Sequence, residues 1–158
     1  MTNKFLQLIN NRFKFGIYLF TKLPSAFICG VRVKTASEES CTVTVPFTWL
    51  SQNPFKSTYF ACLSMAAEMS TGILGLAHVY KRNPPVSMLV VSISGNFFKK
   101  ATGKTIFTCT DGLAIKQAIE DAIATGEGKT ITVKSTGTNA QGEVVASFEV
   151  TWSFKAKK

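Results

Sequence analysis

The sequence predicts a single α+β domain in which one long, buried helix is wrapped by a curved antiparallel β-sheet. Its 158 residues, of which 46% are hydrophobic and 17% charged, suit one compact domain with a sizeable core. The stretch 57–78 is apolar or small on every side, which is typical of a helix surrounded by protein. Apolar and polar residues alternate in 27–47 and again after residue 86, which is typical of strands.

The N-terminal stretch 3–23 carries apolar residues at the spacing of one or two short amphipathic helices that stop before Pro24. Asn, Arg and Lys interrupt it too often for a membrane span, and no apolar run leads to a small-residue cleavage site, so we expect a cytoplasmic protein. No acid occurs before Glu38, which makes the first 37 residues basic. Two interpretations follow: peripheral contact with anionic lipid head groups, or a solvated basic face on a packed helix.

The next region predicts two strands and then the long helix. The alternation in 27–47 indicates two strands with a turn near 37–39. An Asn-Pro turn signal follows, and Ser57 or Thr58 can then cap the long helix. That helix should run to about His78.

The second half predicts a sheet with one further helix. Four segments have the strand pattern: 87–100, 105–110, 129–139 and 143–155. A hairpin at 139–142 joins the last two, and residues 113–125 have helical spacing before a Gly-Glu-Gly break. The last strand alternates most clearly, and its predicted packed side consists of Val144, Ala146, Phe148, Val150, Trp152 and Phe154.

The charge balance and the cysteine pattern restrict the function classes. The 18 Lys plus Arg against nine Asp plus Glu give 18 − 9 = +9, which favours anionic partners. The cations are scattered and no nucleic-acid recognition motif occurs, so a nucleic-acid module is disfavoured. One histidine, His78, and the absence of a CxxC pair predict no metal site and no cofactor. We expect four free thiols: Cys29, Cys41, Cys62 and Cys109.

Glu68 is the residue that most needs an explanation. It is the only side-chain carboxylate between Glu39 and Asp111, it lies within the apolar helix, and its immediate neighbours offer no cation. Burial would raise the pKa of this carboxyl and hold it ready as a general base or nucleophile. Two alternatives stay open: pairing with a distant Lys or Arg, and a position at a subunit contact with access to solvent.

Two segments resemble the hotdog-fold thioesterase superfamily. Segment 53–72, NPFKSTYFACLSMAAEMSTG, is similar to the stretch in which an Asn-containing loop enters a helix and a carboxylate follows two turns later. Segment 92–108, SISGNFFKKATGKTIFT, resembles the corner after that family's third strand. The resemblance is closest to the phenylacetic-acid-degradation type of acyl-CoA thioesterase. It implies one hotdog domain over residues 1–158, with an N-terminal helical segment (1–24) and a hotdog core (26–155).

The resemblance also implies the catalytic site. By position, Glu68 matches the helix carboxylate that activates water or attacks the thioester, and Asn53 matches the loop amide. The backbone N–H groups of Phe60 and Ala61, at the start of the helix, would stabilise the oxyanion. The sequence departs from the family pattern here, because Tyr59-Phe60-Ala61 stands where the family often has His-Gly-Gly.

The implied substrate is acyl-CoA or a related thioester, and the implied assembly is a homodimer with a shared site, or a tetramer of such dimers. An apolar tunnel would hold the acyl chain, lined by Phe55, Tyr59, Leu63 and Phe97. A basic corner would hold the nucleotide phosphates, unless it is merely solvated: Lys99, Lys100 and Lys104, joined by Lys56. The function implied is thioester hydrolysis. The alternative is a non-catalytic acyl-chain or lipid-binding hotdog protein that uses the same tunnel.

Overall fold

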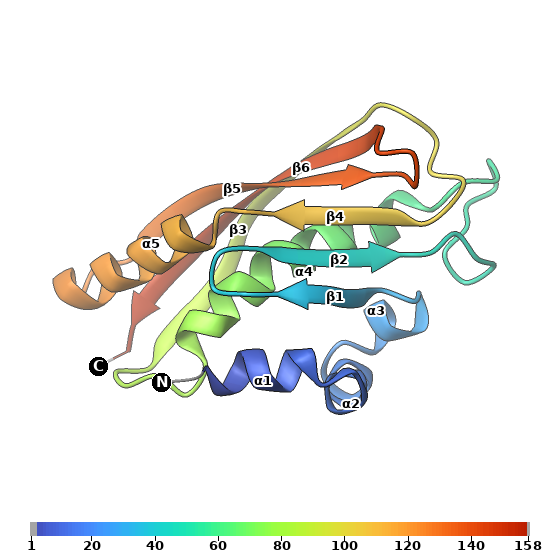
Figure 1. Cartoon of the computed structure of the whole chain (residues 1–158). Helices are drawn as coiled ribbons and strands as arrows, with labels where there is room; N and C mark the ends of the chain where they lie inside the picture. Colours follow the sequence, from blue (N-terminus) through green and yellow to red (C-terminus); the bar gives the residue numbers. More distant parts are fainter. Residues whose placement is uncertain (1–2, 158) are drawn as a thin grey trace.

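The computed structural model of the chain describes residues 3–157, and its elements follow the predicted order (Figure 1). The helices are α1 (Lys4–Asn10), α2 (Arg12–Lys22), α3 (Pro24–Ile28), α4 (Phe60–Val79) and α5 (Gly112–Thr125). The strands are β1 (Arg32–Ala36), β2 (Cys41–Val45), β3 (Val86–Phe97), β4 (Thr105–Cys109), β5 (Lys129–Thr138) and β6 (Val144–Ala156).

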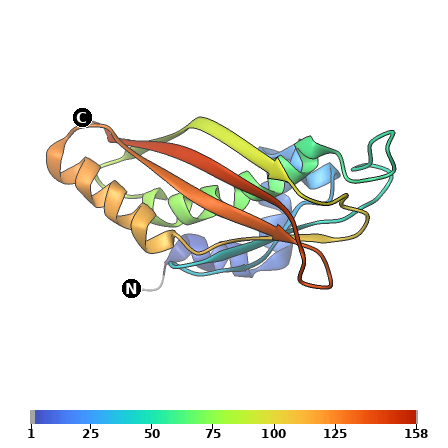
Figure 2. The same cartoon turned by 90° about the horizontal axis from the view of Figure 1, so that it is seen from above.

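The strands form one antiparallel sheet in the order β1-β2-β4-β5-β6-β3. The sheet curves around α4, which lies along its inner face (Figures 1 and 2). Strands β1 and β3 are its two edges, and β3 is twelve residues long. A register shift between Val90 and Ser92 leaves Val91 as a bulge in β3. This architecture confirms the predicted α+β class, with a long central helix in a curved antiparallel sheet.

Helix α4 is the centre of the core, because most of its surface contacts other elements. Two glycines let the sheet come close: a Cβ on Gly72 would lie 3.2 Å from Trp152 Cζ2, and one on Gly75 would lie 2.5 Å from Met88 Cε. Within residues 3–157, α4 is the one helix long and apolar enough to cross a membrane by length and composition. Most of it is buried inside the fold, as expected of a core helix.

Strand β6 confirms the predicted alternation except at its start. The side chains of Ala146, Phe148, Val150, Trp152 and Phe154 are buried, as predicted, but Val144 is exposed and Val145 is buried. The cause is a register shift, because Gly137 pairs with Ala146 while Thr138 pairs with Val144, so that Val145 is an extra residue. The Val145 carbonyl instead accepts hydrogen bonds from the N–H groups of Phe98 and Lys99, at 2.8 and 3.3 Å.

The N-terminal segment differs from the prediction at its end. Helices α1 and α2 lie where one or two helices were expected, but the chain continues into α3, with Pro24 at its first position. Proline fits that position because its missing N–H would have no helical partner there. The prediction of strand pattern from residue 27 is therefore wrong for Phe27 and Ile28, and β1 begins at Arg32.

Candidate active site

The Glu68 carboxylate lies at a small, mostly apolar cavity of about 260 Å³. The lining residues come from the α2–α3 junction and from α4: Lys22, Leu23, Pro24, Ser25, Ala26, Met65, Glu68 and Met69. Burial raises the pKa of the Glu68 carboxyl above its usual range. Within residues 3–157 the carboxylate forms no ion pair and no side-chain hydrogen bond. The alternative of pairing with a distant cation is therefore not seen among the residues that the structure describes.

Three residues outside the predicted site hold the Glu68 segment in place. Gly72, one turn further along α4, leaves room for the carboxylate, since a Cβ there would lie 3.2 Å from Glu68 Oε1. Trp152 of β6 donates from Nε1 to Thr71 Oγ1 at 2.9 Å, and the Thr71 hydroxyl donates to the Glu68 carbonyl at 2.8 Å. Of these residues, Gly72 could have been found from the sequence, because it is a glycine four positions after Glu68 in the same helix.

The start of α4 presents two unpaired backbone donors. Tyr59 precedes the helix in an extended conformation, and its side chain makes no capping hydrogen bond. The N–H groups of Phe60 and Ala61 find no acceptor within the described part of the chain, residues 3–157. Free N–H groups at a helix start favour an anion or a developing oxyanion.

The predicted cap at Ser57 or Thr58 is wrong, because both hydroxyls are used elsewhere. The Ser57 hydroxyl interacts with the Asn53 side chain. Thr58 donates from both its backbone N–H and its hydroxyl to the Ala101 carbonyl, at 2.8 and 3.1 Å. The loop before α4 is thereby tied to the corner between β3 and β4, and this contact brings two predicted segments of the site together.

These two segments line an open groove of about 530 Å³. Its walls contain eight of the twelve predicted site residues: Asn53, Phe55, Tyr59, Phe60, Leu63, Phe97, Lys99 and Lys100. Four predicted residues do not line it: Lys56, Ala61, Glu68 and Lys104. The structure therefore gathers the predicted apolar residues and two of the four predicted lysines in one groove, and it places the predicted carboxylate at a different cavity.

Asn53 shapes the loop at one end of this groove. Its Oδ1 accepts hydrogen bonds from the N–H groups of Phe55 and Ser57, at 3.0 and 3.2 Å. Its Nδ2 donates to the Ser57 hydroxyl at 3.0 Å. This is an Asx-type turn, in which the amide holds the backbone that leads to α4. The structure thus shows Asn53, the predicted match of the family's loop amide, holding the loop before α4 in place.

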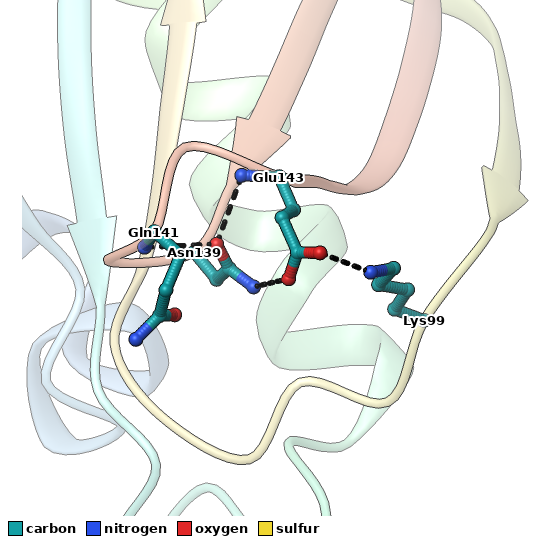
Figure 3. Close-up of polar contacts among 4 residues, drawn as sticks. All are labelled: Lys99, Asn139, Gln141 and Glu143. Carbon is teal, nitrogen blue, oxygen red and sulfur yellow. Dashed lines mark hydrogen bonds and ion pairs between the residues drawn. The ribbon is translucent and has the colours of Figure 1, made fainter.

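The basic corner is partly neutralised by an acid from the β5–β6 hairpin (Figure 3). Lys99 Nζ lies 2.5 Å from Glu143 Oε1, and Asn139 Nδ2 donates to Glu143 Oε2 at 2.8 Å. The hydrogen bond from Lys99 holds the pKa of the Glu143 carboxyl below its usual range. Lys100 Nζ lies 3.4 Å from the Phe55 carbonyl oxygen and forms no ion pair within residues 3–157. Of the two lysines in the groove, Lys100 is the better placed to meet a phosphate.

The two halves of the predicted catalytic site, the start of α4 and Glu68, lie far apart along the helix. Ala61 and Glu68 are seven positions apart, and an α-helix rises about 1.5 Å per residue, so they lie about 10 Å apart along the helix axis. A thioester carbonyl held at the start of this helix would therefore be out of reach of the same chain's Glu68.

Metal ligands do not gather in the described region. Among residues 3–157, no group of three His, Cys, Asp or Glu side chains could hold a metal ion, and the four cysteines are free. His78 is buried near the end of α4, and its Nε2 has no hydrogen-bond partner within residues 3–157. Burial is the main cause that lowers the pKa of His78 below its usual range.

Comparison with known proteins places these features in a family. A family model described as "Domain of unknown function (DUF4442)" matches residues 14–154. A search of curated proteins finds no match.

Three solved structures share the fold. A protein of unknown function from Pseudomonas aeruginosa, named "Probable Thioesterase", superposes with a TM-score of 0.79 at 20% identity, over 92% of this chain and 96% of its own. A protein of unknown function from Chlorobaculum tepidum gives 0.79 at 13% identity, over 98% and 100%. A thioesterase from Haemophilus influenzae gives 0.66 at 13% identity, over 92% and 91%. The fold is thus the hotdog fold, which the chain shares with the probable thioesterase from P. aeruginosa and the thioesterase from H. influenzae, and the chain belongs to the DUF4442 family.

Proposed function

We propose that this protein hydrolyses an acyl-CoA or a related acyl thioester, with Glu68 as the general base or nucleophile. The observation that carries the proposal is the unpaired Glu68 carboxylate at an apolar cavity, with its pKa raised by burial. A carboxyl whose pKa lies closer to neutrality is a more effective proton acceptor than an exposed one. The thioesterase names of structures with the same fold support the same reaction class.

In the general-base form of the reaction, Glu68 removes a proton from water, and the water oxygen attacks the thioester carbonyl carbon. The carbonyl oxygen becomes an oxyanion, which the N–H groups of Phe60 and Ala61 stabilise. The carbon–sulfur bond then breaks, and the leaving thiolate takes the proton from Glu68. The products are a carboxylic acid and a free thiol.

A homodimer completes this site in the proposal. The carboxylate and the helix N-terminus of one chain lie about 10 Å apart along α4, so the N–H groups that act with Glu68 come from a second chain. Strand β3 supports the assembly, because it is an edge strand of the sheet and its side chains Leu89, Val91 and Ile93 are exposed at 67%, 57% and 45%. Pairing of two β3 edges across a two-fold axis would cover this edge.

The groove beside the start of α4 fits the acyl chain and the CoA nucleotide of the proposed substrate. Its apolar wall is built by Phe55, Tyr59, Leu63, Phe97 and Phe98. Lys100 at its rim, with Lys56 and Lys104 on the neighbouring loops, would attract the phosphates of the CoA nucleotide. Lys99 contributes less to that attraction, because its charge is paired with Glu143.

A second candidate function, acyl-chain binding without hydrolysis, is favoured by one observation. The ring centroids of Tyr59 and Phe60 lie 4.8 Å apart, edge to face, and Phe60 stands where the related motif often has a glycine. Both side chains line the groove, so they narrow the approach of a thioester to the free N–H groups of Phe60 and Ala61. A protein that binds an acyl chain without hydrolysing the thioester would tolerate these two rings in the groove.

The test is thiol release from a panel of acyl-CoA chain lengths by the wild type, Glu68→Gln and Glu149→Gln. Glu68→Gln should abolish turnover, because the amide is isosteric but accepts no proton. Glu149, exposed on β6, is the matched control and should keep the wild-type rate. If Glu68→Gln keeps more than about a tenth of the rate, a barrier increase below about 1.4 kcal/mol, Glu68 is not the catalytic group. Binding of acyl-CoA without thiol release would support the second function.

The assembly is tested by light scattering. The proposal predicts a particle of twice the 17.2 kDa chain mass at micromolar concentration. A monomer that still turns over thioester would contradict the shared site, because Glu68 would then have to act without the second chain's helix N-terminus.

A further inference from the structure

Helix α2 is apolar on two opposite sides. Phe15 and Leu19 are buried at 3% and 1% exposure and face the protein. Phe13, Ile17 and Phe20 are exposed at 79%, 52% and 57%. With about 100° per residue, these three side chains fall on the side opposite Phe15 and form a stripe along the helix. A stripe of large apolar side chains in water marks a surface that another molecule covers.

The stripe continues onto neighbouring elements. Phe20 packs edge to face on Phe27 of α3 at 5.4 Å, and the Arg32 guanidinium lies 4.1 Å above the Phe27 ring. Between α2 and these residues there is an open hollow of about 400 Å³. Its walls are Arg12, Phe13, Gly16, Ile17, Phe20, Phe27 and Arg32. Together, these residues form what we call the α2 face.

Positive charge flanks the α2 face. On the helical wheel, Arg12 and Lys14 lie on either side of the apolar stripe, and Lys22 ends the helix. None of these three cations forms an ion pair within residues 3–157. The first acid in the sequence is Glu38, so α2 itself carries no negative charge. The occupant of the face should therefore present apolar groups in the centre and negative charge at the rim.

We propose that the α2 face docks on the surface of a bilayer that contains anionic lipids. The Phe13, Ile17 and Phe20 side chains enter the acyl boundary, and Arg12 and Lys14 meet the lipid phosphates. A second copy of the chain is a poorer occupant. A two-fold interface would place this face against itself, and the unpaired cations would repel each other. The proposed pairing edge, β3, lies at the other end of the strand order from β1, beside which the N-terminal helices begin (Figures 1 and 2).

The test is flotation of the full chain with vesicles of phosphatidylcholine alone and of phosphatidylcholine with about 30% phosphatidylglycerol, an anionic fraction in the range that gives a cell-like surface potential. The wild type should float with the anionic vesicles only, and high salt should weaken the binding. Arg12→Gln with Lys14→Gln should weaken it about 25-fold, or about fivefold per cation. The matched control, Lys134→Gln with Lys157→Gln, removes the same charge from exposed positions elsewhere. Apart from a small non-specific loss of affinity, it should bind the vesicles like wild type.

The apolar part of the face is tested separately. Phe13→Gln should reduce flotation at both low and high salt, whereas Leu113→Gln, at another exposed apolar position on α5, should have no effect. Circular dichroism confirms that each variant is folded. Equal binding to neutral vesicles, equal losses in the two charge variants, or no binding to anionic vesicles would overturn the proposal. A smaller particle for Phe13→Gln in light scattering would also overturn it, because a second copy would then cover the face.

Discussion

Replacing Gly72 with alanine tests whether the placement of the Glu68 carboxylate controls turnover. The added Cβ would lie 3.2 Å from Glu68 Oε1 and 3.2 Å from Trp152 Cζ2, whereas ordinary van der Waals contacts begin at 3.4 Å. Trp152 is held by its indole hydrogen bond to Thr71 and by burial in the core. The carboxylate has no such partner, so it is the group that moves.

The size of the effect follows from this geometry. A contact of 3.2 Å requires a displacement of about 0.3–0.5 Å, and misplacement by about 1 Å can cost about 100-fold in rate, so kcat should fall about four- to tenfold. The folded state should change little. Alanine is about 1 kcal/mol more favourable than glycine in a helix, and this gain offsets a similar cost of overpacking.

The control is Gly75→Ala, on the same helix. Its Cβ would meet the flexible end of Met88, at 2.5 Å from Cε and 2.8 Å from Sδ, away from Glu68. Steady-state thiol release and thermal unfolding are measured for both variants. The reasoning is refuted if Gly72→Ala keeps the wild-type kcat, or if Gly75→Ala loses as much activity, since the loss would then come from the helix core.

Three further predictions concern other parts of the molecule. A Cβ on Gly16, in α2, would have nothing within 4 Å, so Gly16→Ala should raise the unfolding free energy in urea by about 0.5–1 kcal/mol, and a decrease would contradict this. Because burial lowers the pKa of His78, the unfolded chain binds that proton more readily, so stability should be complete above about pH 6.5 and decline as the pH falls below it. His78→Leu should flatten this decline, and an unchanged slope would rule out His78 as its source. Lys100→Ala should weaken acyl-CoA binding in calorimetry, in a salt-dependent way, more than Lys99→Ala does, because Lys99 is already paired with Glu143. Equal losses would count against a phosphate contact at Lys100.

Local patterns in the sequence predicted the features that depend on local chemistry. The alternation of β6 was readable because each side chain's burial follows from the two-residue period of a strand. Glu68 could be singled out because it is an acid in an otherwise apolar helix, and its cavity and raised pKa agree with that signal.

Features that depend on contacts between distant segments could not be read in this way. The Lys99–Glu143 pair joins positions 44 apart, and Trp152 meets Thr71 across 81 positions. Nothing in the sequence near Lys99 shows that its charge is neutralised by Glu143, an acid in a hairpin that follows two strands later. The helix at Pro24 was missed for a different reason, because the same proline can end one helix or begin another.

The position of β6 between β3 and β5 has a consequence for how the chain folds as it is synthesised. Strand β3 is the third strand to be synthesised, but its hydrogen-bonding partner β6 is the last strand of the sheet. The 59 residues between the ends of β3 and β6 take about 3–12 s to translate at 5–20 residues per second. During that interval β3 has no strand paired on either side. Its open edges and the apolar side chains between Met88 and Ile93 are then a target for chaperones and for neighbouring nascent chains. The nascent chain therefore stays at risk of aggregation until β6 arrives and closes one edge.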